Sequence, residues 1–182
     1  MKKLFIFLLI FNFKIVNSSE IKLEKIADDL NKPWSLSFIN KDSIIFTEKS
    51  GKLFTFNIKN KKKIAIKHNL SVLEDGQGGL LDVLFHEGKL YLSYSENRGN
   101  KETSTSVAKG DFDKQSIKFK NIFRAEPPID SGYHFGSRLV IKNDHLFVTA
   151  GERGLGMIAQ DATKHPGSVI RINLDGSIPK DN

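Results

Sequence analysis

The feature that most constrains the fold of this chain is a repeated unit of short strands. Beyond about residue 30, apolar and polar residues alternate over short runs between clusters of Gly, Asn, Asp and Ser, which is the pattern of half-buried strands. The first unit predicts strands at 35–39, 44–48, 52–58 and 63–67. The second predicts strands at 80–85, 89–94, 103–111 and 116–123, with a polar loop from 95 to 101. The third predicts strands at 138–141, 145–149 and 168–174.

Units of four strands that recur roughly every 45 to 55 residues predict the blades of a β-propeller, an all-β fold. Closed propellers contain about four to eight blades, whereas this chain supplies two full units and a third without its last strand. We therefore expect residues 19–182 to be the N-terminal part of a larger propeller domain. A sandwich of two sheets with about ten or eleven strands is the alternative fold for the same strand pattern.

Residues 1–18 have the pattern of a bacterial secretory signal peptide. A lysine pair is followed by an apolar run at 4–13 and by small residues up to Ser18. The run is about half as long as the roughly 20 apolar residues that span a bilayer. We therefore expect cleavage after Ser18, a periplasmic or secreted protein, and no stable membrane span. Lys14 is unusually close to the expected cleavage site, which leaves an uncleaved anchor as the alternative.

Composition excludes several classes of site and partner. The chain contains no cysteine, which rules out disulfide frameworks, thiolate zinc sites, iron–sulfur clusters and cysteine nucleophiles. Its formal net charge of +7 is scattered along the sequence. Nucleic-acid binding needs a concentrated basic face, so we expect no nucleic-acid partner. These properties leave a homodimer open.

Two candidate site residues lie in the loops before the second and third units, and such loops gather at one end of a propeller. Gln77 lies in the loop 74–79, whose three glycines let the backbone approach a ligand, and its amide can bind a sugar hydroxyl. A glycine turn with a solvated amide is the alternative. His134 is a candidate general base, because an imidazole titrates near neutral pH. A packed or exposed loop histidine is the alternative.

Two arginines are candidate ligands for a substrate or cofactor. Arg138 follows His134 closely and is either an anion ligand or a surface salt-bridge partner. Arg153 has a planar fork of donors that suits a carboxylate or an oxyanion, and an ion pair with Glu152 or Asp161 is the alternative. Those two carboxylates also suit calcium, but the spacing of a calcium loop is absent from the sequence.

Six short motifs occur in order along the chain: PWSLSF at 33–38, QGGLLD at 77–82, HFGSRL at 134–139, GERG at 151–154, AQD at 159–161 and GSIPKDN at 176–182. Their order and spacing resemble the soluble glucose/sorbosone dehydrogenase family, in particular its bacterial periplasmic aldose sugar dehydrogenases. The likeness covers residues 30–182. It implies a six-bladed β-propeller about twice as long as this chain, with pyrroloquinoline quinone (PQQ) and Ca²⁺ as cofactors.

The resemblance also implies an activity. Family members oxidise an aldose sugar to a lactone by transferring a hydride from the anomeric carbon to the quinone, and the electrons pass to an acceptor of the respiratory chain. By motif match, His134 takes the hydroxyl proton and Gln77 helps to hold the substrate beside the cofactor. The family's calcium ligands and most of its quinone-binding residues lie beyond the third blade. We therefore expect the 182-residue chain alone to be inactive.

Two residues depart from the glucose-oxidising branch of that family. Tyr133 stands where the branch has an aspartate that contacts sugar, which puts a preference for glucose in doubt. The branch also has a loop arginine near the position of Leu155, whereas this chain has Arg153 two positions earlier.

Two other functions fit the same sequence. A propeller that lacks the quinone site would bind a sugar or a partner in the cell envelope without catalysis. A calcium-dependent lactonase on a similar propeller would consume a lactone without an electron acceptor, and it would need converging carboxylates.

Overall fold

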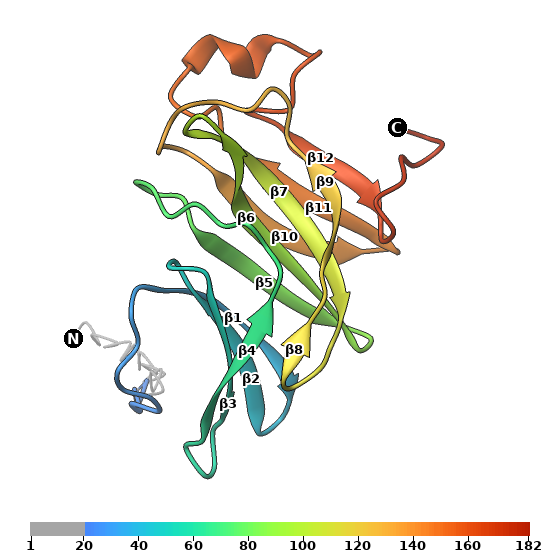
Figure 1. The fold of residues 1–182 in the computed structure, drawn as a ribbon. Coiled ribbons are helices and arrows are strands. Elements are labelled where there is room, and N and C mark those ends of the chain that lie inside the picture. Colours follow the sequence, from blue (N-terminus) through green and yellow to red (C-terminus); the bar gives the residue numbers. More distant parts are fainter. Residues whose placement is uncertain (1–20) are drawn as a thin grey trace, which may run out of the picture.

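The computed structural model describes residues 21–182, and the predicted signal peptide lies outside this range. Three sheets follow one another along the chain (Figure 1). The first contains β1 (Pro33–Asn40), β2 (Ser43–Glu48), β3 (Lys52–Asn57) and β4 (Lys63–His68). The second contains β5 (Leu80–His86), β6 (Lys89–Gly99), β7 (Glu102–Asp111) and β9 (Lys120–Arg124), and the third contains β10 (Gly136–Lys142), β11 (His145–Ala150) and β12 (Val169–Asn173). The three predicted units are confirmed as separate sheets, which excludes the two-sheet sandwich.

One predicted loop is wrong. β6 continues through the polar segment at 95–99, because its far half pairs with β7 as far as Gly99 and Glu102. Ser95 and Glu96 are buried in this extension. The Glu96 carboxylate accepts hydrogen bonds from the Ser106 hydroxyl at 2.7 Å and from the Arg124 Nε at 2.7 Å, so the polar segment is satisfied inside the sheet.

One predicted strand is divided. The chain over 116–123 forms β8 (Ser116–Ile117), which pairs in parallel with β4 of the first sheet, and then β9, which pairs with β7 of the second. Asn69 fastens the link between the two, because its amide donates to the Phe119 carbonyl at 3.0 Å and accepts from the Phe119 N–H at 2.7 Å. The segment between β8 and β9 therefore connects the first two sheets.

The alternation of apolar residues is explained by burial on both faces of the second sheet. Leu90 and Leu92 of β6 pack in a cluster with Ile45 of the first sheet. Tyr91, between them, packs in a second cluster with Leu146 of the third sheet. Successive side chains of a strand point to opposite faces, so one strand supplies both clusters.

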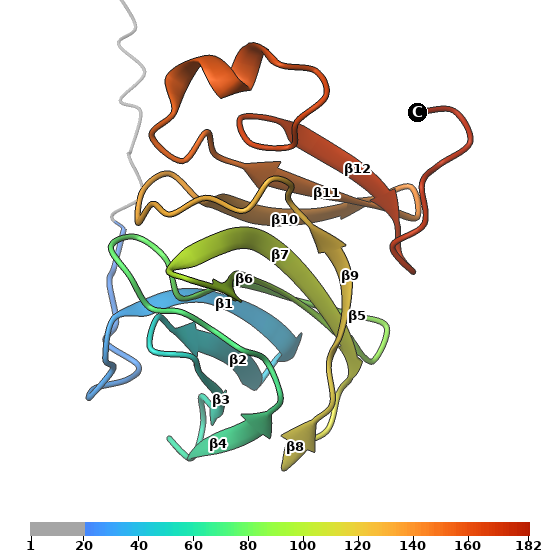
Figure 2. The same cartoon turned by 45° about the horizontal axis from the view of Figure 1, so that its top comes forward.

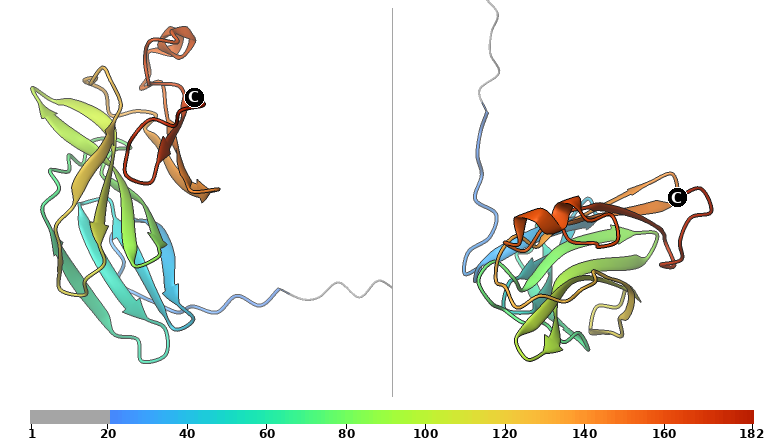
Figure 3. Two further views of the ribbon diagram at one scale, coloured as in Figure 1. Left: turned by 90° about the vertical axis from the view of Figure 1, so that its right-hand side faces the viewer. Right: turned by 90° about the horizontal axis from the view of Figure 1, so that it is seen from above.

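The sheets are arranged as successive layers in chain order (Figure 2). The first and third sheets lie on opposite sides of the second, as two further views show (Figure 3). β5 contacts both β1 and β10, so the first strands of the three sheets are neighbours. A 3₁₀ helix, η1 (Gly156–Gln160), lies in the long loop between β11 and β12. Within residues 21–182, no helix is long and apolar enough to cross a membrane.

Candidate functional site

The candidate site lies where the loops before β5 and β10 meet the loop after β11. The β10–β11 hairpin pairs Gly136 with Ala150, and His134 and Glu152 lie just outside the two strands, each two residues from this pair. The loop that carries Gln77 reaches the same place, because the Gln77 N–H donates to the Gly132 carbonyl at 2.7 Å. Three segments that are distant in the sequence are thus brought together.

His134 is held by its backbone and by its ring. Its backbone N–H donates to Oε1 of Gln77 at 2.9 Å, and its φ of +49° lies in the left-handed region, which is uncommon for a residue with a side chain. The ring Nδ1 is hydrogen-bonded to Oε1 of Glu152. The side chain is 52% exposed, so the ring remains open to solvent beside these contacts.

Glu152 fixes the tautomer of this imidazole. The hydrogen bond with His134, supported by the N–H of Gly154 at 3.1 Å, holds the pKa of Glu152 below its usual range, so the group is a carboxylate at neutral pH. A carboxylate only accepts hydrogen bonds, so the proton of a neutral His134 ring lies on Nδ1 and the lone pair lies on Nε2. In the described part of the chain, Nε2 has no hydrogen-bond partner.

The glycines beside Gln77 bring two protein loops together rather than leaving room for a ligand. A Cβ at Gly76 would lie 2.5 Å from the carbonyl oxygen of Gly132, and a Cβ at Gly78 would lie 2.8 Å from the ring of Phe135. Both distances are below ordinary contact, so Gly76 and Gly78 fit against residues 132–135 only because they lack side chains. This corrects the expectation that these glycines admit a ligand.

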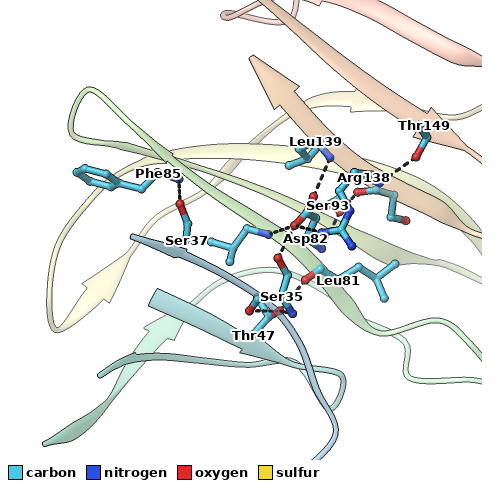
Figure 4. Close-up of polar contacts among 12 residues, drawn as sticks. Ser35, Ser37, Thr47, Leu81, Asp82, Phe85, Ser93, Arg138, Leu139 and Thr149 are labelled. Atoms are coloured by element: carbon cyan, nitrogen blue, oxygen red, sulfur yellow. Dashed lines mark hydrogen bonds and ion pairs between the residues drawn. The ribbon is translucent and has the colours of Figure 1, made fainter. Parts of the chain in front are cut away.

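Arg138 lies among the first strands of the three sheets (Figure 4). Its Nη1 donates to Oδ1 of Asp82 at 3.0 Å, and its guanidinium lies 4.7 Å from the centre of the Trp34 ring. The side chain is 57% exposed. Arg138 therefore forms a salt bridge, as one of the two expectations held, and much of its guanidinium remains open to solvent.

Asp82 was not singled out by sequence reasoning, although it joins all three sheets. Its buried carboxylate accepts hydrogen bonds from the Ser35 hydroxyl of β1, from Arg138 and from the Leu139 N–H of β10, the last at 2.8 Å (Figure 4). The Val83 N–H is a further donor at 3.0 Å. This carboxylate therefore sets the relative placement of the strands that lead into the candidate site.

Arg153 is placed differently from both expectations. Its side chain is buried, and each of its three guanidinium nitrogens already donates to oxygen atoms of the protein. The ion-pair alternative is also wrong, because Glu152 is bonded to His134 and Asp161 accepts from Thr163. The structure brings Gln77, His134 and Glu152 together at the surface and places Arg153 beneath them.

No metal centre is formed by the part of the chain that the structure describes, because no group of three or more His, Asp or Glu side chains there could hold an ion. Two of the other histidines contact backbone groups away from this site. His68 contacts the Gly51 carbonyl through Nε2 at 2.7 Å, and Nδ1 of His165 lies 2.9 Å from the Glu126 N–H.

Comparison with known proteins gives one consistent result. Residues 30–182 match the family described as Glucose / Sorbosone dehydrogenase. The aldose sugar dehydrogenase YliI of Escherichia coli K12 is 31% identical over 172 residues, which cover 89% of this chain and 46% of that protein. Quinoprotein glucose dehydrogenase B of Acinetobacter calcoaceticus is 28% identical over 204 residues, which cover 93% of this chain and 43% of that protein.

Solved structures extend this result to the fold. The apo form of the soluble aldose sugar dehydrogenase from Escherichia coli superposes with a TM-score of 0.83 at 31% identity, covering 87% of this chain and 49% of that one. The chain thus spans about half the length of the relatives that it matches. The predicted propeller fold, with about three blades in this chain, is confirmed.

Proposed function

Because this chain belongs to the glucose/sorbosone dehydrogenase family, we propose that the whole protein is an exported quinoprotein that oxidises aldose sugars to lactones, with His134 as the general base. The observation that carries the proposal is the imidazole of His134, held at Nδ1 by Glu152 and open at Nε2 beside Gln77. Two relatives are sugar dehydrogenases by name, and one of them is a quinoprotein. Export to the periplasm or medium is part of the proposal.

His134 supplies the base at Nε2. In the oxidation, the C–H bond at the anomeric carbon breaks with loss of a hydride, the hydroxyl proton on that carbon goes to Nε2, and the carbon–oxygen bond becomes the lactone carbonyl. The imidazolium that forms is stabilised by the carboxylate of Glu152 at Nδ1. Glu152 is therefore a positioning residue for His134 in this proposal, a role that sequence reasoning missed.

Gln77 orients the substrate next to this base. Its amide oxygen is occupied by the His134 N–H, which leaves its NH₂ group as a donor to a sugar oxygen. Tyr133 presents an aromatic ring, 61% exposed, at 6.1 Å from the centre of the His134 ring. We propose that this ring takes part in sugar selection.

The open donors in this chain fit part of a quinone site. PQQ carries carboxylates and carbonyl oxygens, and the guanidinium of Arg138 and the NH₂ group of Gln77 are a cation and a donor that would hold such groups. When bound, the quinone supplies the two-electron acceptor for the hydride. Ca²⁺ and an acceptor in the respiratory chain complete the proposal, and no residue of this chain is assigned to either.

The test is sugar-dependent dye reduction by the full-length protein loaded with PQQ and Ca²⁺. We expect His134→Ala to lower the rate by about two to four orders of magnitude, the usual contribution of a general base. His145→Ala is the matched control, because His145 is the first residue of β11, at the opposite end of the hairpin from His134, and its ring contacts the Asn143 carbonyl. An unchanged rate in His134→Ala would remove this residue as the base.

The same assay separates the other functions. If the loaded wild-type protein reduces no dye with any aldose, a non-catalytic sugar-binding or partner-binding propeller replaces the proposal. If the protein consumes a lactone without an electron acceptor, a lactonase replaces it.

A further inference from the structure

The most unusual charged group in the described chain is the guanidinium of Arg153, which is 2% exposed. Its Nε donates to the Tyr133 carbonyl at 2.9 Å, and its Nη1 donates to the Thr103 carbonyl at 3.1 Å. Its Nη2 donates to the Thr103 hydroxyl at 2.6 Å and to the Ser131 carbonyl. One side chain thus binds the start of β7 and both ends of the tripeptide 131–133.

These partners are neutral oxygen atoms, so the positive charge is buried without a carboxylate. The guanidinium also lies over the Phe135 ring, 3.7 Å from its centre, which is a cation–π contact. Burial lowers the pKa of Arg153 to about 10, and the group therefore stays charged at neutral pH. An apolar side chain would fill this space without desolvating a charge, so the donor fork itself needs an explanation.

The atoms that Arg153 holds surround His134. Tyr133 and Phe135 are its two neighbours in the chain, and His134 itself has the left-handed backbone conformation described above. A residue with a side chain keeps that conformation only where the surrounding structure enforces it. Phe135 also packs against Gly78, next to Gln77, so the guanidinium and the ring that it covers reach all three loops of the site.

We propose that Arg153 is a positioning residue that holds the His134 loop in register with Gln77 and Glu152, rather than a ligand of substrate or cofactor. The part of this inference that concerns catalysis rests on the proposed function, in which His134 is the base. Lysine cannot take over this role, because a single ammonium cannot reach four oxygen atoms in the directions that a planar fork serves.

The first test is hydrogen exchange in the full-length protein, which needs neither sugar nor turnover. The backbone N–H of Gln77 donates to the Gly132 carbonyl, and the backbone N–H of His134 donates to Oε1 of Gln77. In Arg153→Met, we expect these two N–H groups to exchange at least about tenfold faster, while the backbone N–H groups of β6 exchange at unchanged rates. Arg153→Lys should give an intermediate change. Arg171→Met is the control, because Arg171 lies on β12 and pairs with exposed Asp181.

The second readout is kinetic, in the loaded enzyme. A misplaced base should lower kcat by about tenfold or more while KM for the sugar changes much less. Unchanged exchange at Gln77 and His134 in both Arg153 variants would overturn the proposal, whatever the protein's activity. Faster exchange with an unchanged kcat per folded molecule would overturn the positioning role in catalysis. If Arg153→Met does not fold, the same criteria apply to Arg153→Lys.

Discussion

The imidazole of His134 and the carboxylate of Glu152 meet across the open end of the β10–β11 hairpin. Each lies two residues beyond the pair of Gly136 and Ala150. A two-stranded ladder therefore fixes the separation of the candidate base and its acceptor, and the proton of a neutral ring is kept on the nitrogen that faces the carboxylate.

Replacing Glu152 with glutamine should lower kcat for sugar oxidation by about tenfold to a thousandfold. The glutamine amide can donate to Nδ1, which moves the ring proton to Nε2 and removes the lone pair there. ¹⁵N NMR spectroscopy of the His134 ring measures the tautomer, and Glu87→Gln in the exposed turn after β5 is the control. An unchanged tautomer with an unchanged kcat would contradict the assigned role of Glu152.

Replacing Asp82 with alanine should lower the free energy of unfolding by about 2–4 kcal/mol. The change removes the shared acceptor of Ser35, Arg138 and Leu139, and it leaves a buried N–H group without its partner. Denaturant unfolding followed by circular dichroism measures the loss. Asp111→Ala, at an exposed position at the end of β7, should change the value by less than about 0.5 kcal/mol. Equal effects of the two substitutions would show that the three-sheet contact contributes little.

Glu96 should make the protein sensitive to acid. Burial by itself would raise the pKa of Glu96, but hydrogen bonds from Arg124 and Ser106 outweigh it and hold the pKa below the usual range. Its contribution to stability is therefore complete above the unfolded-state value of about 4.3 and is lost as the pH falls through the lower folded-state value. Unfolding measured from neutral pH into this range should show a smaller pH dependence in Glu96→Gln. In Glu87→Gln, at an exposed position in the turn after β5, the dependence should stay near that of the wild type, and identical pH profiles of wild type and Glu96→Gln would contradict the prediction.

Tyr94 should make the protein less stable at alkaline pH. Burial, together with the nearby charge of Glu96, raises the pKa of Tyr94 to about 12. The unfolded chain ionises its tyrosines near pH 10, so the stabilising effect of a neutral Tyr94 is present below about pH 10 and is lost as the pH rises through 12. Tyr94→Phe also loses the hydrogen bond to Asn121, at a cost of about 1 kcal/mol at neutral pH. The difference in unfolding free energy between the wild type and Tyr94→Phe should therefore shrink above pH 10. A difference that stays constant as the pH rises would contradict the assigned role of Tyr94.

The strands were predictable wherever apolar residues alternate. The exception at 95–99 lacks apolar alternation, and the burial of Glu96 within it depends on Ser106 and Arg124 from two other strands. No local pattern carries that information, because a buried charge is decided by partners that are remote in the sequence.

The candidate site was predictable only in part, because some of its contacts join residues that are remote in the sequence. The loops of Gln77 and His134 could be selected because they lead into blades. Glu152 had only an approximate signal. The predicted turn at 142–144 makes the two strands pair, but counting outward from it places residue 134 opposite residue 153. The register shift between Gly136 and Leu139, which the sequence does not reveal, moves the partner to residue 152. Arg153 had no such signal, since three of its four acceptors are backbone carbonyls that any sequence would offer.

The short parallel pairing of β8 with β4 has a consequence for how the chain comes apart. After building most of the second blade, the polypeptide returns to the first and is fastened there by β8 and by the paired contacts of Asn69 with Phe119. Unfolding either of these blades breaks strand pairing or hydrogen bonds of the other, so we expect the first two blades to unfold as a single cooperative unit. Within residues 21–182, no strand of the third sheet pairs with another sheet, so tension applied at the C-terminal end of this sheet should separate it first.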